Sequence, residues 1–470
     1  MKNRLLSWGY SSAVVVDSER DCGRVEGDGF MHLLYSLRGA VWLLVYLLFI
    51  LAPLFALLAG SHPPSRDFWT ELSVAFGYSG LAMMGLQFGL TARFRYVTAP
   101  WGEDVIYHFH RQISLIAVGL VVAHPIILVA VQPQLLAPSN MLEAPLTAHF
   151  ALVSIAAVIV LVVTALWRVT LKIKYETWHL IHVVLAVVAI TAGVVHMVGS
   201  SFYLVDPWKR SLWIGLTAFW IGLLFYVRIV KPLFMLRQPY RVAEVRKERG
   251  DTFTLVMQPD KHRGFRFSPG QFGWLTLWES PFAITAHPFS FSSSAAATDR
   301  RVEMTIRNLG DFTSNVHKVP AGQRVYLDGP YGAFTIGNPT DMHVLIAGGI
   351  GVTPMMSMIR TLADQEDKRP IVLLYGVQDW ESITFREELE ELKARLNLTV
   401  VYVLSKPPTG WTGETGFINA EILKRYLMPP YADHEYFICG PNVMMDAIEK
   451  ALGEMNVPMS KYHSERYSFV

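Results

Sequence analysis

The sequence predicts an α-helical membrane bundle of six helices, followed by an antiparallel β-barrel and an α/β domain of the Rossmann-like type. Three observations support this fold class. Of the 470 residues, 52% are hydrophobic and 17% are charged, whereas globular chains carry about a quarter charged residues. The apolar residues are concentrated before about residue 235. Beyond that point, short strand-like segments are followed by strands that alternate with helices.

The composition excludes several classes of protein. So few charges are incompatible with a disordered chain, and a net charge of +2 gives no reason to expect a nucleic-acid partner. The two cysteines, Cys22 and Cys439, cannot form a disulfide framework, and a cysteine that stays reduced indicates the cytosolic side. A prior of about 150 residues per domain gives roughly three units.

Six segments are long enough to cross a hydrocarbon core, which requires about 20 apolar residues. The second is the weakest, because it carries Glu71, Gln87 and several glycines. Residues 1–38 form a polar tail that is too long for the n-region of a signal peptide, so the first segment is expected to be a retained helix. The six spans are predicted at Gly39–Ala59, Phe68–Leu90, His108–Val131, Leu146–Trp167, Trp178–Ser200 and Leu212–Val230 within a membrane domain of residues 39–231.

Lysine and arginine predict the orientation, since they are enriched in cytoplasmic connections. They are frequent in the tail, in the second and fourth connections and after the last span. The alternate connections hold Arg66, no basic residue between 132 and 147, and Lys209 with Arg210. Both termini are therefore predicted to be cytoplasmic, with the helices in the inner or plasma membrane.

The remainder of the chain divides into two predicted domains. Residues 238–335 contain short strands separated by turn signals, which is typical of a small antiparallel barrel. Residues 341–470 alternate between strands and helices, as nucleotide-binding sheets do. The strands of this second domain are predicted at His343–Ala347, Ile371–Tyr375, Thr399–Leu404 and Tyr436–Cys439, and its helices at Pro354–Asp364, Ser382–Leu396, Ala420–Leu427 and Val443–Met455.

Two of the predicted spans carry a matched pair of histidines each. The third contains His110 and His124, and the fifth contains His182 and His196. Each pair is 14 positions apart, which leaves both side chains within about 40° of one helix face and about 21 Å apart along the axis. Imidazole is a good axial ligand for haem iron. The pattern predicts two stacked haems, one between His110 and His182 and one between His124 and His196.

Other histidines nearby fit this pattern less well. A single histidine in a span is more often a polar residue satisfied at a helix interface, but four in register indicate a function, because ionisable groups inside membranes are rare. His108 lies about 160° round the helix from His124, and His179 about 100° from His196. His149 stands alone in the fourth span. None of these three is predicted to be a ligand.

Three segments of the cytoplasmic half carry residues suited to flavin and nucleotide binding. The first is His287-Pro288-Phe289-Ser290-Phe291-Ser292. The second contains Arg307, Gly310, Asp311, Phe312 and Thr313; a glycine there allows close backbone approach, and a helix start can bind phosphate oxygens. The third is Gly348-Gly349-Ile350-Gly351-Val352-Thr353-Pro354, which follows a hydrophobic strand and opens a helix as phosphate-binding loops do.

Together with the histidines, these segments resemble the ferric reductase–NADPH oxidase superfamily. Its members have six membrane helices with this histidine arrangement on the third and fifth, and a flavin motif His-Pro-Phe-Thr-(Leu/Ile)-Ser-Ser. The first segment matches that motif with Ser290 in place of threonine. The resemblance implies bound FAD, with the Ser290 hydroxyl near the flavin N5, His287 available to the diphosphate, and the second segment on the pyrophosphate.

The resemblance also assigns the nucleotide side. The glycine loop has Pro354 where the ordinary Gly-x-Gly-x-x-Gly pattern ends in glycine, as the ferredoxin-reductase superfamily does. Tyr375-Gly376 resembles the adenosine-side turn of the family, and Cys439-Gly440-Pro441 resembles its nicotinamide-side turn. The implied role of Cys439 is to shape the hydride-transfer site. Phe469 matches an aromatic that covers the flavin, although Val470 follows it here.

The resemblance implies a transmembrane flavocytochrome b oxidoreductase. Electrons would pass from cytosolic NADH or NADPH through FAD and two haem b groups to an acceptor on the outer face. Oxygen, chelated ferric iron and a periplasmic redox protein all fit as acceptors, and a haem-free, proton-conducting module is the alternative of a different class. Asp379 after the second strand of the α/β domain favours NADH, since a 2′-phosphate prefers Arg or Lys there. No EF-hand-type loop is present in the sequence, so calcium gating is not expected.

Overall fold

The computed structural model describes residues 25–61, 63–94, 103–136, 144–283, 285–297, 300–337 and 340–466. By its internal contacts the chain divides into two compact units, residues 1–47 and 48–470. The N-terminal part of helix α1 (Val25–Phe55) belongs to the first unit. All the other helices and strands belong to the second unit.

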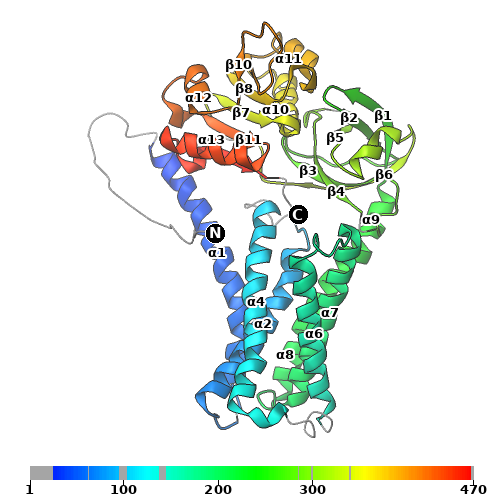
Figure 1. Ribbon diagram of the computed structural model, residues 1–470, viewed down its shortest axis with the longest axis vertical. Coiled ribbons are helices and arrows are strands. Elements are labelled where there is room, and N and C mark those ends of the chain that lie inside the picture. The colour runs from blue at the N-terminus through cyan, green and yellow to red at the C-terminus, as the bar shows by residue number, and fades with distance from the viewer. Residues whose placement is uncertain are drawn as a thin grey trace, which may run out of the picture. The chain divides into compact units, whose positions relative to one another are not determined.

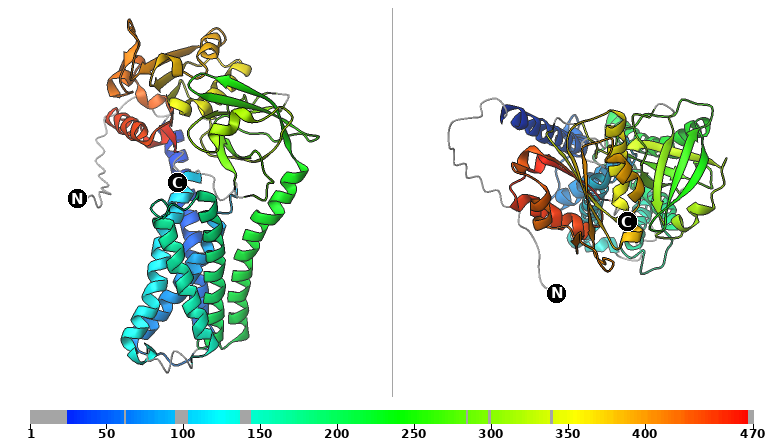
Figure 2. Two further views of the ribbon diagram at one scale, coloured as in Figure 1. Left: turned by 45° about the vertical axis from the view of Figure 1, so that its right-hand side comes forward. Right: turned by 90° about the horizontal axis from the view of Figure 1, so that it is seen from above.

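Long helices make up the first half of the second unit (Figure 1). They run side by side and pack in the pairs α2–α4, α6–α7, α2–α8 and α7–α8 (Figure 2). The last of them continues through a π-helical turn into a short helix, α9. The bounds are α2 (Phe68–Leu90), α4 (Glu103–Val131), α6 (Leu146–Leu166), α7 (Tyr175–Ser200), α8 (Pro207–Phe225), the π-turn Tyr226–Val230 and α9 (Lys231–Arg237).

Among the described residues, five helical segments are long and apolar enough to cross a membrane. They correspond to the first, third, fourth, fifth and sixth predicted spans. Helix α2 is continuous over 23 residues but is not one of the five, because glycines and polar side chains interrupt its apolar residues. The five segments are Gly39–Leu58, Val105–Val131, Leu146–Leu166, Tyr175–Ser200 and Pro207–Arg237.

The small residues of α2 explain how it packs against α4. A Cβ atom at Gly80 would lie 2.7 Å from the Val121 side chain and 3.1 Å from the Ala117 carbonyl oxygen. Such a close approach of two backbones requires glycine, as at many interfaces between membrane helices. Gly80 lowers the hydropathy of α2, and the same residue allows α2 to pack closely against α4.

At the end of the helices that is opposite α9, a buried lysine links two segments of the chain. Lys209 is completely buried, and its Nζ donates to the carbonyl oxygens of Leu57 at 3.0 Å and Ser61 at 2.7 Å. It also forms an ion pair of 3.3 Å with Asp206, whose Oδ2 accepts a hydrogen bond from the Ser61 N–H. These bonds attach the end of the first span to the start of α8.

An antiparallel sheet of six strands follows α9. The strand order is β4-β3-β6-β1-β2-β5, and a single bridge between Phe291 and Met304 joins the region after β4 to β5. The sequence predicts a closed barrel; the structure shows an antiparallel sheet whose two edges meet at this bridge. The strands are β1 (Tyr240–Glu248), β2 (Thr252–Pro259), β3 (Phe272–Thr276), β4 (His287–Ser290), β5 (Val302–Arg307) and β6 (Arg324–Tyr331).

The last part of the chain is a parallel sheet with helices on both faces. Its strand order is β10-β9-β8-β7-β11-β12. Leu345 and Ala347 of β7 pack in one core with α10 and α11, whereas Val344 and Ile346 pack in the other core with α12 and α13. The elements are β7 (His343–Gly348), α10 (Val352–Asp364), β8 (Ile371–Val377), α11 (Arg386–Leu392), β9 (Leu398–Leu404), β10 (Glu414–Thr415), α12 (Ala420–Tyr426), β11 (Glu435–Cys439), α13 (Asn442–Glu454) and β12 (Tyr462–Glu465).

Two details of this sheet differ from the sequence-based prediction. The helix expected at Ser382–Leu396 is shorter, because Phe385 adopts a left-handed conformation (φ +63°) just before α11 begins. The two edge strands β10 and β12 contain two and four residues, which is too short for a period-2 pattern to be recognised.

Replacing Lys209 with methionine should destabilise the helical part of the chain. The substitution leaves the Asp206 carboxylate and two carbonyl oxygens without their donor, at a cost of about 1–3 kcal/mol. Thermal unfolding in detergent should therefore begin at a lower temperature than in the wild type. Lys174→Met removes an exposed lysine and should leave the midpoint unchanged. Equal midpoints for the two variants would contradict the role given to Lys209.

Candidate functional site

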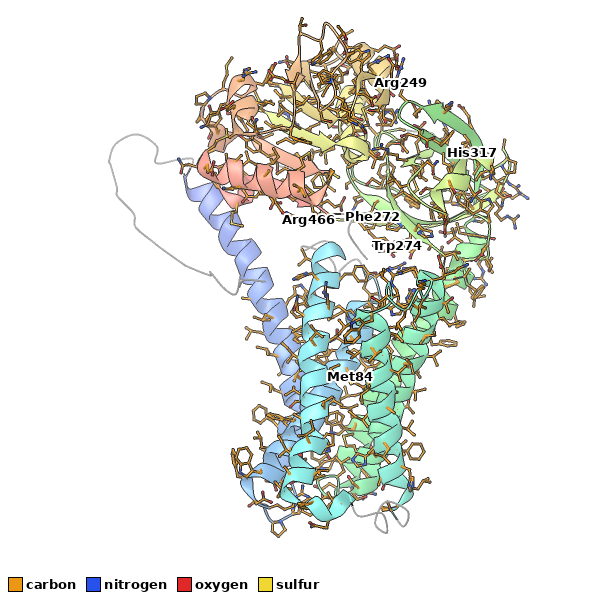
Figure 3. All side chains as sticks on the ribbon, in the orientation of Figure 1. Met84, Arg249, Phe272, Trp274, His317 and Arg466 are labelled. Atoms are coloured by element: carbon orange, nitrogen blue, oxygen red, sulfur yellow. The ribbon has the colours of Figure 1, made fainter. Side chains whose placement is uncertain are left out.

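A cavity of about 1000 Å³ lies at the ends of the helices that face the two sheets. His110 of α4 and His182 of α7 both line it, and their ring centroids are 6.4 Å apart. The cavity extends to β3, β6 and β12, so side chains of the helices and of both sheets surround one space. Met84 of α2 and Trp274 of β3, both of which line the cavity, are labelled in Figure 3.

The orientation of His110 is fixed through its Nδ1 atom. Nδ1 lies 2.8 Å from Oε1 of Gln87 on α2, and an amide oxygen can only accept, so Nδ1 carries the proton. The lone pair is then on Nε2, as in most metal-binding histidines. The Nδ1 atom of His182 is buried and has no hydrogen-bond partner within the described part of the chain.

The second histidine pair is held by backbone carbonyl groups. His124 Nδ1 lies 2.9 Å from the carbonyl oxygen of Ser73, and His196 Nδ1 lies 3.0 Å from that of Thr147. Gly77 makes the first contact possible, because a Cβ atom there would be 3.2 Å from the His124 ring. Both imidazoles therefore donate from Nδ1 and keep Nε2 as the acceptor nitrogen.

The other histidines in the helices are engaged differently. Arg228 Nη2 lies 2.8 Å from His179 Nε2, so this nitrogen accepts a hydrogen bond and is not available to a metal ion. His149 Nδ1 faces the Pro145 carbonyl oxygen at 3.3 Å. His108 is exposed, although it lines the cavity. The choice of His110, His124, His182 and His196 as ligands stays a prediction.

Basic side chains surround His110 and His182, and they were not among the predicted site residues. Guanidinium and ammonium groups bind carboxylates through charge-assisted hydrogen bonds, so this cavity suits a ligand that is apolar at its centre and anionic at its edge. Lysine and arginine residues are frequent at these helix ends, and this enrichment could have indicated the site from the sequence. The basic residues that line the cavity include Arg111, Arg168, Arg228 and Arg466. Arg93 and Lys231 also line it, but they are engaged by Trp274 and Asp328 of the antiparallel sheet.

The two segments expected to bind flavin lie against each other. The rings of His287 and Phe312 have centroids 4.1 Å apart, and Phe289 stacks on Phe312 at 6.0 Å. Burial lowers the pKa of His287 below its ordinary value, although the Glu176 carboxylate opposes this shift. His287 is therefore neutral at pH 7 and can offer a hydrogen bond to a phosphate, without a full positive charge. Ser290 is buried within the sheet.

The loop after β5 is shaped by its own threonine. The Thr313 hydroxyl accepts hydrogen bonds from the backbone N–H groups of Leu309 and Gly310, each at 2.9 Å. It also donates to the Gly310 carbonyl oxygen at 3.1 Å. These three bonds occupy the hydroxyl of Thr313. Thr313 therefore holds the conformation of the loop that contains Asp311 and Phe312.

The glycine loop and the Cys-Gly-Pro turn meet at the carboxyl ends of β7 and β11. A Cβ atom at Gly351 would lie 2.2 Å from the Cys439 carbonyl oxygen, and one at Gly440 would lie 3.0 Å from Gly348 Cα. Gly349 has a φ of +54°, and Arg307 Nη1 lies 3.5 Å from the position of its Cβ. Ligands bind at this edge of parallel sheets, so the predicted phosphate and nicotinamide residues converge where such a ligand would lie.

Several predicted residues support this edge from behind. Val352, Thr353 and Pro354 are buried in the first turn of α10, and Thr353 donates to the Ile350 carbonyl oxygen at 2.9 Å. Tyr375 is completely buried, so any ligand contact at Tyr375-Gly376 falls to the backbone. Phe469 lies outside the described residues.

Asp379 is engaged in a local cap. Its Oδ1 accepts from the Ser382 N–H at 2.9 Å, and the Ser382 hydroxyl lies 3.3 Å from the Asp379 N–H, which completes a capping box. A carboxylate with this role gives no argument for NADH over NADPH. Aspartate is one of the residues that helix N-caps prefer.

Three family models match consecutive parts of the chain. The model described as "Ferric reductase like transmembrane component" matches residues 76–193. "FAD-binding domain" matches residues 237–335, and "Oxidoreductase NAD-binding domain" matches residues 345–450. The chain therefore combines a membrane domain with an FAD- and NAD-binding reductase module.

Similar proteins cover parts of the chain. The glycine betaine monooxygenase reductase subunit of Pseudomonas aeruginosa is 30% identical over 49% of this chain and 64% of its own length. NADH-cytochrome b5 reductase 1 of Laccaria bicolor is 34% identical over 34% of this chain and 54% of its own length. The chain thus spans less than two thirds of these curated relatives. The FAD/NAD-binding domain of a Vibrio cholerae nitric oxide dioxygenase aligns with 48% of this chain and 97% of its own length, at 23% identity and a TM-score of 0.43.

Gly351→Ala should disrupt the nucleotide site. The added Cβ would overlap the backbone atoms of the Cys439–Gly440 peptide, which have little room to move away. We expect weaker NADH binding by calorimetry and a lower unfolding temperature. Gly453→Ala, in an open part of α13, is the matched control and should stabilise the helix by about 0.5–1 kcal/mol. Wild-type NADH affinity in Gly351→Ala would contradict this assignment.

Asp379→Ala should lower stability without changing nucleotide preference. Loss of the cap costs about 1 kcal/mol, whereas the ratio of kcat/KM for NADH to that for NADPH should stay as in the wild type. Steady-state kinetics with both nucleotides and a soluble dye measures this ratio. A clear shift towards NADPH would show that the carboxylate discriminates after all.

Proposed function

The chain belongs to the ferric reductase and NADPH oxidase superfamily, and from this we propose that it is a transmembrane flavocytochrome b oxidoreductase. It would carry electrons from cytosolic NADH or NADPH through FAD and two b-type haems to an acceptor on the outer face. The observation that carries the proposal is the arrangement of histidines on α4 and α7. Two pairs lie on these helices, and three of the four Nδ1 atoms are bonded so that Nε2 is left for a metal ion.

The histidine pairs fit haem in two respects. Histidine nitrogens bind transition metals at about 2 Å, so a metal atom between the rings of His110 and His182 suits their centroid separation of 6.4 Å. The guanidinium groups of the inner cavity suit the carboxylates at the edge of the porphyrin. Haem supplies a one-electron iron couple at each level. The described residues themselves hold and orient the ligands through Gln87, Ser73 and Thr147.

The reductase half fits FAD and a nicotinamide nucleotide. His287, Phe289 and Phe312 form the surface on which we place the flavin, and Gly348–Gly351 with Arg307 forms the cradle for the nucleotide phosphates. Cys439-Gly440-Pro441 would lie beside the nicotinamide, and Phe469 would cover the flavin. FAD supplies the conversion from a two-electron hydride donor to single electrons.

We infer that α2 is a sixth span and that both termini are cytoplasmic. Its length of 23 residues is sufficient, and its glycines pack it against α4, whose own apolarity qualifies it as a span. The proposed domains are the tail 1–38, the membrane domain 39–231, the FAD domain 238–335 and the NAD(P) domain 341–470. Because each electron moves outward across the membrane, its transfer is worth about 2.3 kcal/mol per 100 mV.

The acceptor in this proposal is oxygen or ferric iron, with a periplasmic redox protein as the alternative. A haem whose two axial positions are both filled by histidine has no open position, which favours outer-sphere electron transfer and is compatible with each of them. Neither relative decides between them, since one is the reductase subunit of a monooxygenase and the other is a cytochrome b5 reductase.

His124→Leu should abolish reduction of an impermeant acceptor at the outer face. Electron transfer would stop at the proposed haem between His110 and His182. NADH oxidation with a soluble dye on the cytoplasmic side should continue at the wild-type rate. Sealed vesicles of known orientation measure both activities. If this variant reduced the impermeant acceptor at the wild-type rate, the proposed route of electron transfer would be contradicted.

Haem content tests the ligand assignment directly. His196→Leu should lower the haem content of the purified protein from two groups per chain to one, because a single axial histidine retains haem poorly. His108→Leu is the control, since the exposed His108 is not assigned as a ligand, and it should keep both groups. Haem extraction and quantification against FAD gives the ratio. A wild-type protein without haem would favour the proton-conducting alternative.

A further inference from the structure

Three helix ends converge on one patch of the antiparallel sheet. Phe272, Trp274 and Tyr331 form a buried aromatic cluster on β3 and β6, and Tyr107 of α4 packs against it. Trp274 and Phe272 are labelled in Figure 3 on the part of the sheet that adjoins the helices. The cluster is therefore a contact between the predicted FAD domain and the membrane helices.

Arg93, just after α2, makes the second contact of this patch. Its guanidinium carbon lies 3.4 Å from the centroid of the Trp274 ring, and its Nε donates to the Tyr107 hydroxyl at 3.4 Å. Arg93 has a φ of +53°, a conformation that costs a non-glycine residue energy. A strained residue that stacks on a buried indole is placed there by the surrounding structure.

Lys231, the first residue of α9, makes the third contact. Its Nζ forms an ion pair of 2.8 Å with Asp328 of β6 and donates to the Tyr331 hydroxyl at 2.6 Å. The Tyr331 hydroxyl donates to the other Asp328 oxygen at 2.7 Å. Asp328 lies directly opposite Trp274 in the β3–β6 pairing, so the ion pair and the stacked pair occupy one rung of the sheet.

This patch lies next to His110 and His182, which form the inner histidine pair. Arg93, Tyr107, Lys231, Trp274 and Asp328 all line the cavity that contains His110 and His182. Tyr107 and His110 are three residues apart on α4 and therefore share a helix face. The structure thus couples the docking of the sheet to the same turn of α4 that carries a proposed haem ligand.

We propose that Arg93, Tyr107 and Lys231 form a docking site that holds the FAD domain, through Trp274 and Asp328, at a fixed distance from the inner histidine pair. These are positioning residues: they touch neither nucleotide nor metal, and they act by keeping donor and acceptor close. The proposal rests on the proposed function, because it concerns the transfer of electrons from the flavin domain to the helices. The rate of electron transfer falls with the distance between donor and acceptor, so a loosened dock should slow haem reduction without changing the flavin site.

Charge reversal and charge exchange test the dock in the full-length protein. Lys231→Asp and Asp328→Lys should each slow haem reduction by NADH severalfold, measured by anaerobic stopped flow. Flavin reduction by NADH in the same traces should stay at the wild-type rate. The double variant, which restores opposite charges, should recover haem reduction. Arg241→Glu, in the Arg241–Asp260 ion pair elsewhere on the same sheet, is the control and should behave as the wild type. Unchanged haem reduction in both single variants, or no recovery in the double variant, would overturn the proposal.

A second measurement does not depend on the cofactors. In the chain with Lys231→Cys and Asp328→Cys, a short thiol-specific cross-linker should join the two positions, as identified by mass spectrometry. Absence of the cross-link would overturn the docking contact itself. If the wild type binds no haem but the cross-link forms, the proposed function fails while the dock stands. If haem is reduced normally in all variants, the function stands and the dock fails.

Discussion

A hydrogen-bond partner on its second nitrogen fixes the orientation in which a buried imidazole can bind a metal ion. Inside an apolar helix bundle such partners are scarce, because the helices satisfy their own backbone groups. Here Gln87, the Ser73 carbonyl and the Thr147 carbonyl serve three of the four histidines. The close packing of α2 and α4 through glycines follows from this constraint, since Gly77 lets the Ser73 carbonyl reach His124.

The same need for close approach organises the reductase half. Gly348, Gly351 and Gly440 bring the ends of β7 and β11 so near that a side chain at these positions would overlap backbone or side-chain atoms. The space left above them has Arg307 at its edge. Guanidinium groups lie beside the glycine loop and around the cavity between the helices, which makes both places suited to anionic ligands.

The sequence predicted much of this arrangement, because periodicity and glycine spacing are written in the chain. The histidine pairs on the third and fifth spans, the order of the two sheets and the glycine loop could all be read from it. The partners of the histidines could not, since a carbonyl oxygen has no sequence signal. The docking of Arg93 on Trp274 joins residues about 180 positions apart and becomes visible only in the fold. Asp379 was interpreted as a specificity residue, whereas the structure shows it in a local cap with Ser382.

The central claim is that electrons from a nicotinamide nucleotide reach two haems within one polypeptide. Anaerobic titration of the purified, full-length protein with NADH or NADPH, followed by visible absorption, tests it most directly. The account predicts that FAD and two bis-histidine haems per chain become reduced. A protein whose flavin is reduced while no haem is present, or while bound haem stays oxidised, would contradict it.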